Sequence, residues 1–196
     1  MKFNISKNIE LEKKKFDNFL FNEESLKKRL HVRKQIIKSY KYFQENLQEL
    51  DNPQKSKILI DKFVEDKFHE HDRKIDGIIQ DWVELFEINK ESIDKGFIQT
   101  LAYDASQDEV SIHPSFIPFH TFGKNSVSFS IIMEIWKNTK NNNLDIFLHE
   151  YTHIIWNRLL LSHKIKAEKL SPIGYDYLKE FIPPIVIRHK VWDDIR

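Results

Sequence analysis

Residues 144–160 read LDIFLHEYTHIIWNRLL, and this stretch decides how the second half of the chain folds. Its apolar residues recur at the three- and four-residue spacing of a helix, and they cover most of its circumference. We therefore expect a largely buried helix over residues 144–162, with Asn143 as a candidate N-cap. Histidine and glutamate side chains in such a helix are costly to bury unless they are paired or bound to a metal ion.

The segment His149-Glu150-Tyr151-Thr152-His153 places two histidines one turn apart in this expected helix. Positions i and i+4 share one helix face, so both imidazoles can bind the same metal ion. Glu150 is rotated by about a quarter turn, so it can reach a water molecule on the ion rather than the ion itself. The pattern favours zinc, with His149 and His153 as ligands and Glu150 as the general base.

The expected order of elements resembles that of the zincin metallopeptidases. It consists of short strands, then a helix with H-E-x-x-H, then another helix with an acidic residue. The resemblance covers about residues 97–182. The metzincin variant is excluded, because Trp156 and Leu159 stand where it has a glycine and a third histidine. The gluzincin variant takes its third ligand from a glutamate on the following helix. The resemblance thus implies a zinc peptidase with a small zincin-like core.

Glu180 is the third metal ligand that this resemblance implies, because residues 175–181 have helical character and leave enough chain to turn back. Glu168 is the alternative, although it lies in a charged run, and an ordinary surface role for Glu180 also stays open. Tyr177 and His189 are the candidate catalytic donors to the oxyanion.

An extended substrate is expected to pair with an exposed edge strand, for which residues 126–130 are the candidate by resemblance.

The composition indicates a soluble, globular chain of one domain, or of one domain with a helical extension. The 196 residues carry a net charge of +1 and no cysteine, which excludes disulfides and thiolate nucleophiles. No stretch is long and apolar enough for a membrane span, so a cytoplasmic location is the default expectation. Residues 13–41 hold ten basic and three acidic residues. We interpret them as a solvated helix surface rather than a nucleic-acid site, because no base-stacking motif accompanies them.

The residue pattern changes near residue 95. It predicts a helical region, residues 1–95, and a zincin-like core, residues 96–196, unless both form one compact domain. In the first region, breaks are expected near Asn22 and near His71, and Asn52-Pro53 predicts the start of a helix.

The second region is expected to form an α+β fold with a short, mostly antiparallel sheet. Its elements are a hairpin of residues 97–103 and 109–113, a strand at 126–130, the motif helix, and a helix from 171 to 181. Two prolines, at 183 and 184, are expected to stop that last helix.

The sequence therefore predicts a zinc-dependent peptidase acting on peptide or protein substrates. Two alternatives remain: a catalytically inactive binding module with the same fold, and a helical interaction or regulatory protein in which the motif is fortuitous.

Overall fold

Helices and one small sheet make up the computed structural model, which describes residues 1–21, 23–137, 142–162 and 172–195. The elements in chain order are β1 (Lys2–Ile5), α1 (Ile9–Leu20), α2 (Glu23–Ser39), α3 (Lys41–Glu45), α4 (Leu47–Leu50), α5 (Pro53–Glu70), α6 (Asp72–Leu101), β2 (Glu109–Ser115), β3 (Thr121–Phe122), β4 (Ser126–Ser130), α7 (Ile132–Lys137), α8 (Asn143–Ser162), α9 (Pro172–Ile187) and the 3-10 helix η2 (Lys190–Ile195). The expected α+β class is confirmed.

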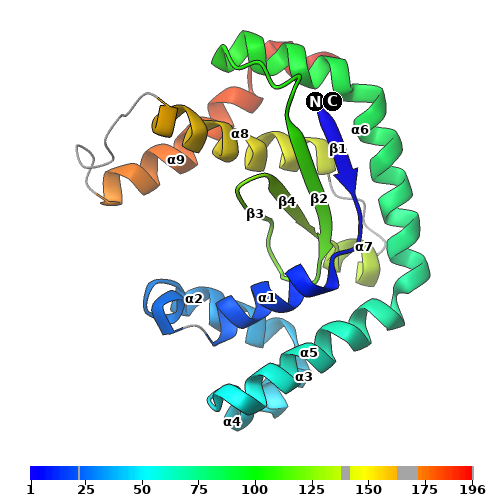
Figure 1. Cartoon of the computed structure of the whole chain (residues 1–196), viewed down its shortest axis with the longest axis vertical. Coiled ribbons are helices and arrows are strands. Elements are labelled where there is room, and N and C mark those ends of the chain that lie inside the picture. The colour runs from blue at the N-terminus through cyan, green and yellow to red at the C-terminus, as the bar shows by residue number, and fades with distance from the viewer. Residues whose placement is uncertain (22, 138–141, 163–171, 196) are drawn as a thin grey trace.

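The helix α6 runs along one side of the molecule and connects its two ends (Figure 1). Helices α1 to α5 gather at one end, α8 and α9 lie at the other, and the sheet stands between them. No helix within the described ranges is long and apolar enough to cross a membrane.

The helix boundaries of the first region follow the signals in the sequence. The side chain of Asn52 accepts hydrogen bonds from the backbone N–H groups of Gln54 and Lys55, both at 3.1 Å, so it caps α5 as expected. Pro53 takes the first helical position, where no N–H is needed. The expected break near His71 is also present, between α5 and α6.

The sheet has the strand order β1-β2-β4-β3, and two of its three pairings are parallel. The expectation of a mostly antiparallel sheet was therefore wrong, because β1 enters from the chain start and runs parallel to β2. Within this sheet only β3 and β4 are antiparallel. The candidate edge strand, Ser126–Ser130, was wrong as well: β4 is paired on both sides, and β3 is the edge next to it.

The two faces of the sheet differ in polarity. The register places Phe3, Ile112, Val127 and Phe129 on one face, where Phe129 meets Trp82 of α6 at a ring distance of 5.0 Å. Alternation along the strands gives an apolar layer that packs against α6 and α8.

The opposite face is polar and meets α1. Ser115 donates a hydrogen bond of 2.9 Å to the buried carboxylate of Glu12, and Lys15 donates to Ser128. Burial raises the pKa of Glu12 and lowers that of Lys15, since each charge has little contact with water. Ser128 is 1% exposed, so its hydroxyl group is shielded from solvent.

The expected hairpin of residues 97–103 and 109–113 was wrong in its first strand. Helix α6 continues to Leu101, and Ala102 ends it in the left-handed conformation, with a φ of 51°. The ring of Phe97 packs against Tyr151 and Trp192, with centroids 5.2 Å away in both cases. This tertiary packing overrides the strand preference of the aromatic and β-branched residues.

The prolines at 183 and 184 do not stop α9, which continues to Ile187. Proline disfavours a helix interior because it removes a hydrogen-bond donor, but the burial of Pro183 and Val186 offsets that cost. Val186 is 5% exposed, and its carbonyl accepts a hydrogen bond of 2.8 Å from the indole of the fully buried Trp192.

The two regions expected from the sequence share structural elements. The boundary at residue 95 falls inside α6, and β1 of residues 1–95 pairs with β2 of residues 96–196. The core is continuous across that boundary.

Gly96 on α6 lies against the ring of Trp192, and a methyl group there would overlap the ring atoms. We expect Gly96→Ala to lower the free energy of unfolding by about 1–3 kcal/mol through overpacking. Gly77→Ala on the same helix is the control, because nothing lies within 4 Å of its added methyl group. That variant should gain up to about 1 kcal/mol of helix propensity. Urea unfolding measures both, and equal effects of the two changes would contradict the packing role of Gly96.

Candidate metal centre

Helix α8 carries the H-E-x-x-H segment, and it confirms the buried helix expected from the sequence. Its apolar residues lie in the core: Leu144, Phe147, Leu148, Tyr151, Ile154 and Ile155 are each at most 3% exposed. The N-cap is one residue earlier than expected, because Asn142 accepts a hydrogen bond of 3.3 Å from the N–H of Asp145.

A polar network fixes the rotation of α8 relative to the sheet. The Asp108 carboxylate, just before β2, accepts hydrogen bonds from Tyr151 and Arg158 of α8 and from Tyr103, the last at 2.9 Å. Arg158 also donates to Asn125 at 3.0 Å. Because Tyr151 follows Glu150 directly, this network determines which way the motif residues face.

The two histidines of the motif face each other. Their Nε2 atoms are 3.2 Å apart, and their rings are nearly perpendicular, at 81°. Two nitrogens bound at 2.0–2.1 Å to one tetrahedral zinc ion would be about 3.3 Å apart. The imidazoles therefore already have the separation that a shared ion requires.

Glu180 of α9 completes the group. Its Oε2 atom lies 3.8 Å from Nε2 of His153, and the ligand atoms of all three residues lie within 4.8 Å of one another. Among the residues that the structure describes, no other group of three histidine, cysteine or acidic side chains meets this criterion. The Glu180 side chain is 63% exposed, so it has freedom to move closer to the two imidazoles.

The protonation of the histidines also suits a cation. Burial, followed by the charges of His149 and Lys179, lowers the pKa of His153 to about 3, and burial lowers that of His149. Both rings are thus neutral near pH 7, which is the form that binds metals. The Nδ1 atom of His153 has no hydrogen-bond partner among the described residues. In this it departs from most ligand histidines, whose second nitrogen is held by a partner.

Glu150 is half-buried beside the two histidines. Burial, and then the negative charge of Glu180, raises the pKa of Glu150 to about 7. Its carboxyl group therefore exchanges a proton near neutral pH, which is suitable for acid–base chemistry.

Two aromatic side chains next to the cluster were not identified from the sequence. Phe122 of β3 stacks on the His153 ring, with centroids 4.8 Å apart and an interplanar angle of 24°. His120, just before β3, accepts a hydrogen bond of 3.1 Å from the N–H of Ser130. Burial, followed by the charge of His149, lowers the pKa of His120. Only the pairing of β3 with β4 brings these residues to α8, so no sequence spacing indicates them.

The remaining predicted site residues have less support. His189 is exposed in the turn after α9, and its Nδ1 accepts a hydrogen bond of 3.2 Å from Val191. It is nine residues beyond Glu180, roughly 13 Å along a helix axis. Tyr177 belongs to α9, but its side chain is not described, and Glu168 lies outside the described residues. The oxyanion role of Tyr177 and His189 stays a prediction.

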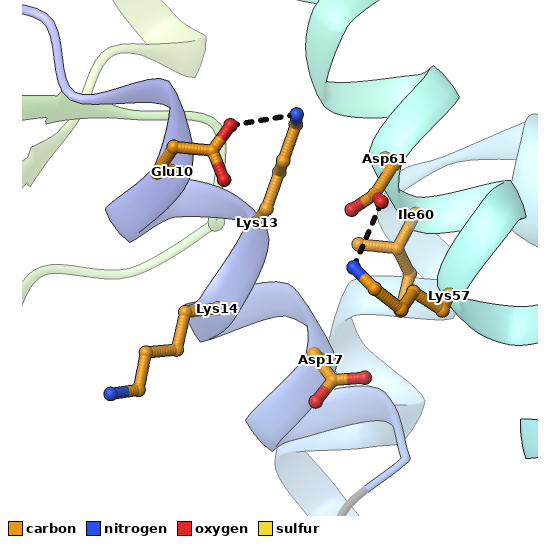
Figure 2. A pocket seen from close by; sticks show the side chains of 7 residues that line it. All are labelled: Glu10, Lys13, Lys14, Asp17, Lys57, Ile60 and Asp61. Atoms are coloured by element: carbon orange, nitrogen blue, oxygen red, sulfur yellow. Dashed lines mark hydrogen bonds and ion pairs between the residues drawn. The ribbon is translucent and has the colours of Figure 1, made fainter.

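A hollow of about 220 Å³ lies between α1 and α5, and no residue of the His149–His153–Glu180 cluster lines it (Figure 2). Three lysines and three acidic residues line it, together with Ile60: Glu10, Lys13, Lys14, Asp17, Lys57 and Asp61. Lys13 pairs with Glu10 at 2.8 Å and Lys57 with Asp61 at 2.9 Å, and these pairs are drawn in Figure 2. The lining has no net charge, so it offers no concentrated basic surface for a polyanion.

Comparison with known proteins adds no family to this description. No family model, curated protein or solved structure matches the chain.

We expect the purified protein to bind one zinc ion per chain and to unfold at a higher temperature when zinc is present. His149→Ala should weaken zinc binding by more than about 100-fold, because even outer partners of ligands contribute 10–100-fold. Elemental analysis and chelator competition measure the affinity. His69→Ala, which changes an exposed histidine of α5, should leave it unchanged. Equal zinc binding by both variants would rule out the cluster as the metal site.

The Asp108 network allows a separate test of how α8 is held. We expect Asp108→Asn to lower the free energy of unfolding by about 1–3 kcal/mol, because the Arg158 charge loses its partner. Tyr103→Phe removes one hydroxyl group and should have a smaller effect. Chemical denaturation measures the free energy of unfolding of both variants. A larger loss of stability in Tyr103→Phe than in Asp108→Asn would contradict the central role of Asp108.

Proposed function

We propose that this protein is a zinc-dependent hydrolase of peptide bonds, with His149, His153 and Glu180 as the metal ligands. The observation that carries the proposal is the convergence of these three side chains from two helices. Glu180 is 27 positions beyond His153 in the sequence, and it is the glutamate that the gluzincin resemblance implies as third ligand. Its position 3.8 Å from the His153 ring nitrogen supports the ligand set.

Glu150 is the proposed general base, since it neighbours the ligand His149 and its side chain is half-buried. A zinc ion held by His149, His153 and Glu180 would polarise the carbonyl group of the cleaved bond and lower the pKa of a water molecule. The Glu150 carboxylate would accept a proton from that water as the water oxygen adds to the carbonyl carbon, and would deliver the proton to the nitrogen as the C–N bond breaks.

The peptide substrate is proposed to bind in an extended form along β3. This strand pairs with β4 on one side only, and its Phe122 stacks on the ligand His153. The free backbone groups of an edge strand can pair with an added strand, which gives affinity without strong sequence preference. The cytoplasmic location expected from the sequence stays part of this proposal.

A non-catalytic binding module is the second candidate. Two features of the described residues favour it: the Nδ1 of His153 without a hydrogen-bond partner, and the exposed Glu180. Outer hydrogen bonds to metal ligands contribute about 10–100-fold to affinity or activity, so a ligand set that lacks them is expected to bind zinc more weakly or to be less active. The third interpretation, a helical regulatory protein with a fortuitous motif, predicts no zinc binding at all.

The change Glu150→Gln separates these functions. We expect it to retain one zinc ion per chain and to lower the cleavage rate by about 10²–10⁴-fold, the usual contribution of a general base. Cleavage is measured by mass spectrometry on a denatured protein and on a library of quenched fluorescent peptides. Glu84→Gln on α6 is the matched control, and it should keep the native rate. Full activity of Glu150→Gln would exclude the mechanism, and zinc binding without any cleavage by the native protein would favour the binding module.

A further inference from the structure

Lys179 precedes the proposed ligand Glu180 on α9, and its side chain is folded inward, with 24% exposure. Its ammonium nitrogen lies 4.7 Å from the centre of the Phe122 ring, an arrangement typical of a cation–π contact. It also lies 3.8 Å from Oε1 of Glu180. Two contacts from different elements, β3 and α9, therefore hold this charge in place.

The position of the ammonium places it at the candidate metal centre. The Phe122 ring that it contacts also stacks on the ligand His153. The two oxygens of the Glu180 carboxylate have different neighbours: Oε2 lies near His153, and Oε1 lies near Lys179. The charge of Lys179 accordingly influences the pKa values of His149, Glu150 and His153.

A lysine at this position does not help to bind a metal. Its positive charge repels a divalent cation, and it competes with that cation for the carboxylate of Glu180. We therefore expect the Lys179 charge to act after metal binding, when a negatively charged oxygen of the substrate is present at the site. An ammonium group beside the metal ligands offers a second positive centre for an oxygen that is anionic or becomes so.

We propose that the Lys179 ammonium binds an anionic oxygen of the substrate at the zinc site. This inference rests on the proposed function. It assigns to Lys179 the electrophilic role for which the sequence suggested Tyr177 and His189. The oxygen is either the carbonyl oxygen of the cleaved bond or a carboxylate close to it.

Two variants and one control test the role without relying on activity alone. Lys179→Met removes the charge at similar length, Lys179→Arg keeps the charge, and Lys62→Met removes a lysine of α5 that is 64% exposed. Each protein is loaded with cobalt as a spectroscopic substitute for zinc and titrated with inorganic phosphate. Zinc affinity is measured separately by chelator competition.

We expect Lys179→Met to bind zinc as tightly as the native protein, or more tightly, while its phosphate affinity falls by about tenfold or more. Lys179→Arg should recover most of that affinity, and Lys62→Met should match the native protein. If Lys179 only stabilises the fold, zinc and phosphate affinity will fall together. Unchanged phosphate affinity with zinc retained overturns the inference alone, whereas failure of the native protein to bind metal overturns the proposed function too.

Peptide cleavage distinguishes the two sources of the anionic oxygen. If it is the carbonyl oxygen, Lys179→Met lowers kcat for amidated and free-acid peptides alike. If it is a carboxylate, KM rises only for peptides with a free carboxylate near the cleaved bond. Native kcat and KM for both peptide classes would overturn the inference.

Discussion

The packing of α8 against α6 and against the apolar face of the sheet is the interaction on which the rest of the structure depends. Phe147 of α8 touches Phe3 of β1 and Phe86 of α6, with ring centroids 5.5 and 5.0 Å apart. This one aromatic cluster joins the chain start, the long helix and the motif helix. Burial of apolar side chains stabilises the packing of α8 against its neighbours. The Asp108 network selects the rotation of α8 about its axis, because hydrogen bonds are directional while hydrophobic burial is not.

The candidate metal centre shows a gradient of burial that follows from this packing. His153 is 2% exposed, and its ring is held between α8 and Phe122. Glu180 extends from α9, where the side chain is mostly exposed. The His153 imidazole is thus held in place by the core, while the Glu180 carboxylate is more free to rotate. If the cluster binds an ion as proposed, most of the entropy cost of ordering its ligands would fall on Glu180.

Sequence reasoning identified what depends on local periodicity. The motif helix, the strand at residues 126–130 and the cap at Asn52 follow from spacing and from well-understood residue preferences. Glu180 was found through a resemblance, and the structure places it beside His153, although whether it binds metal stays a prediction. Those inferences needed no knowledge of which distant segments meet.

The errors concern contacts between segments that are far apart in the sequence. The four residues of β1 carry too little pattern to indicate a strand, and their partner lies in the other half of the chain. Phe122 and Lys179 were missed for the same reason, since they lie near the histidines only because of how β3 and α9 are placed in the fold. The continuation of α6 past residue 96 depends on Trp192, whose ring fills the space beside Gly96.

The pairing of β1 with β2 also constrains how the chain can fold during synthesis. Lys2 and Glu109 are 107 positions apart, so β1 has no partner in this sheet until those intervening residues have been made. At about 5–20 residues per second, that interval is roughly 5–20 s. Throughout it, Phe3 and Ile5 remain unpaired on the nascent chain as potential sites for chaperone binding. The pairing of β1 is thus a late event in folding, and the sheet is complete only after β3 and β4, which follow β2 in the sequence, have also been made.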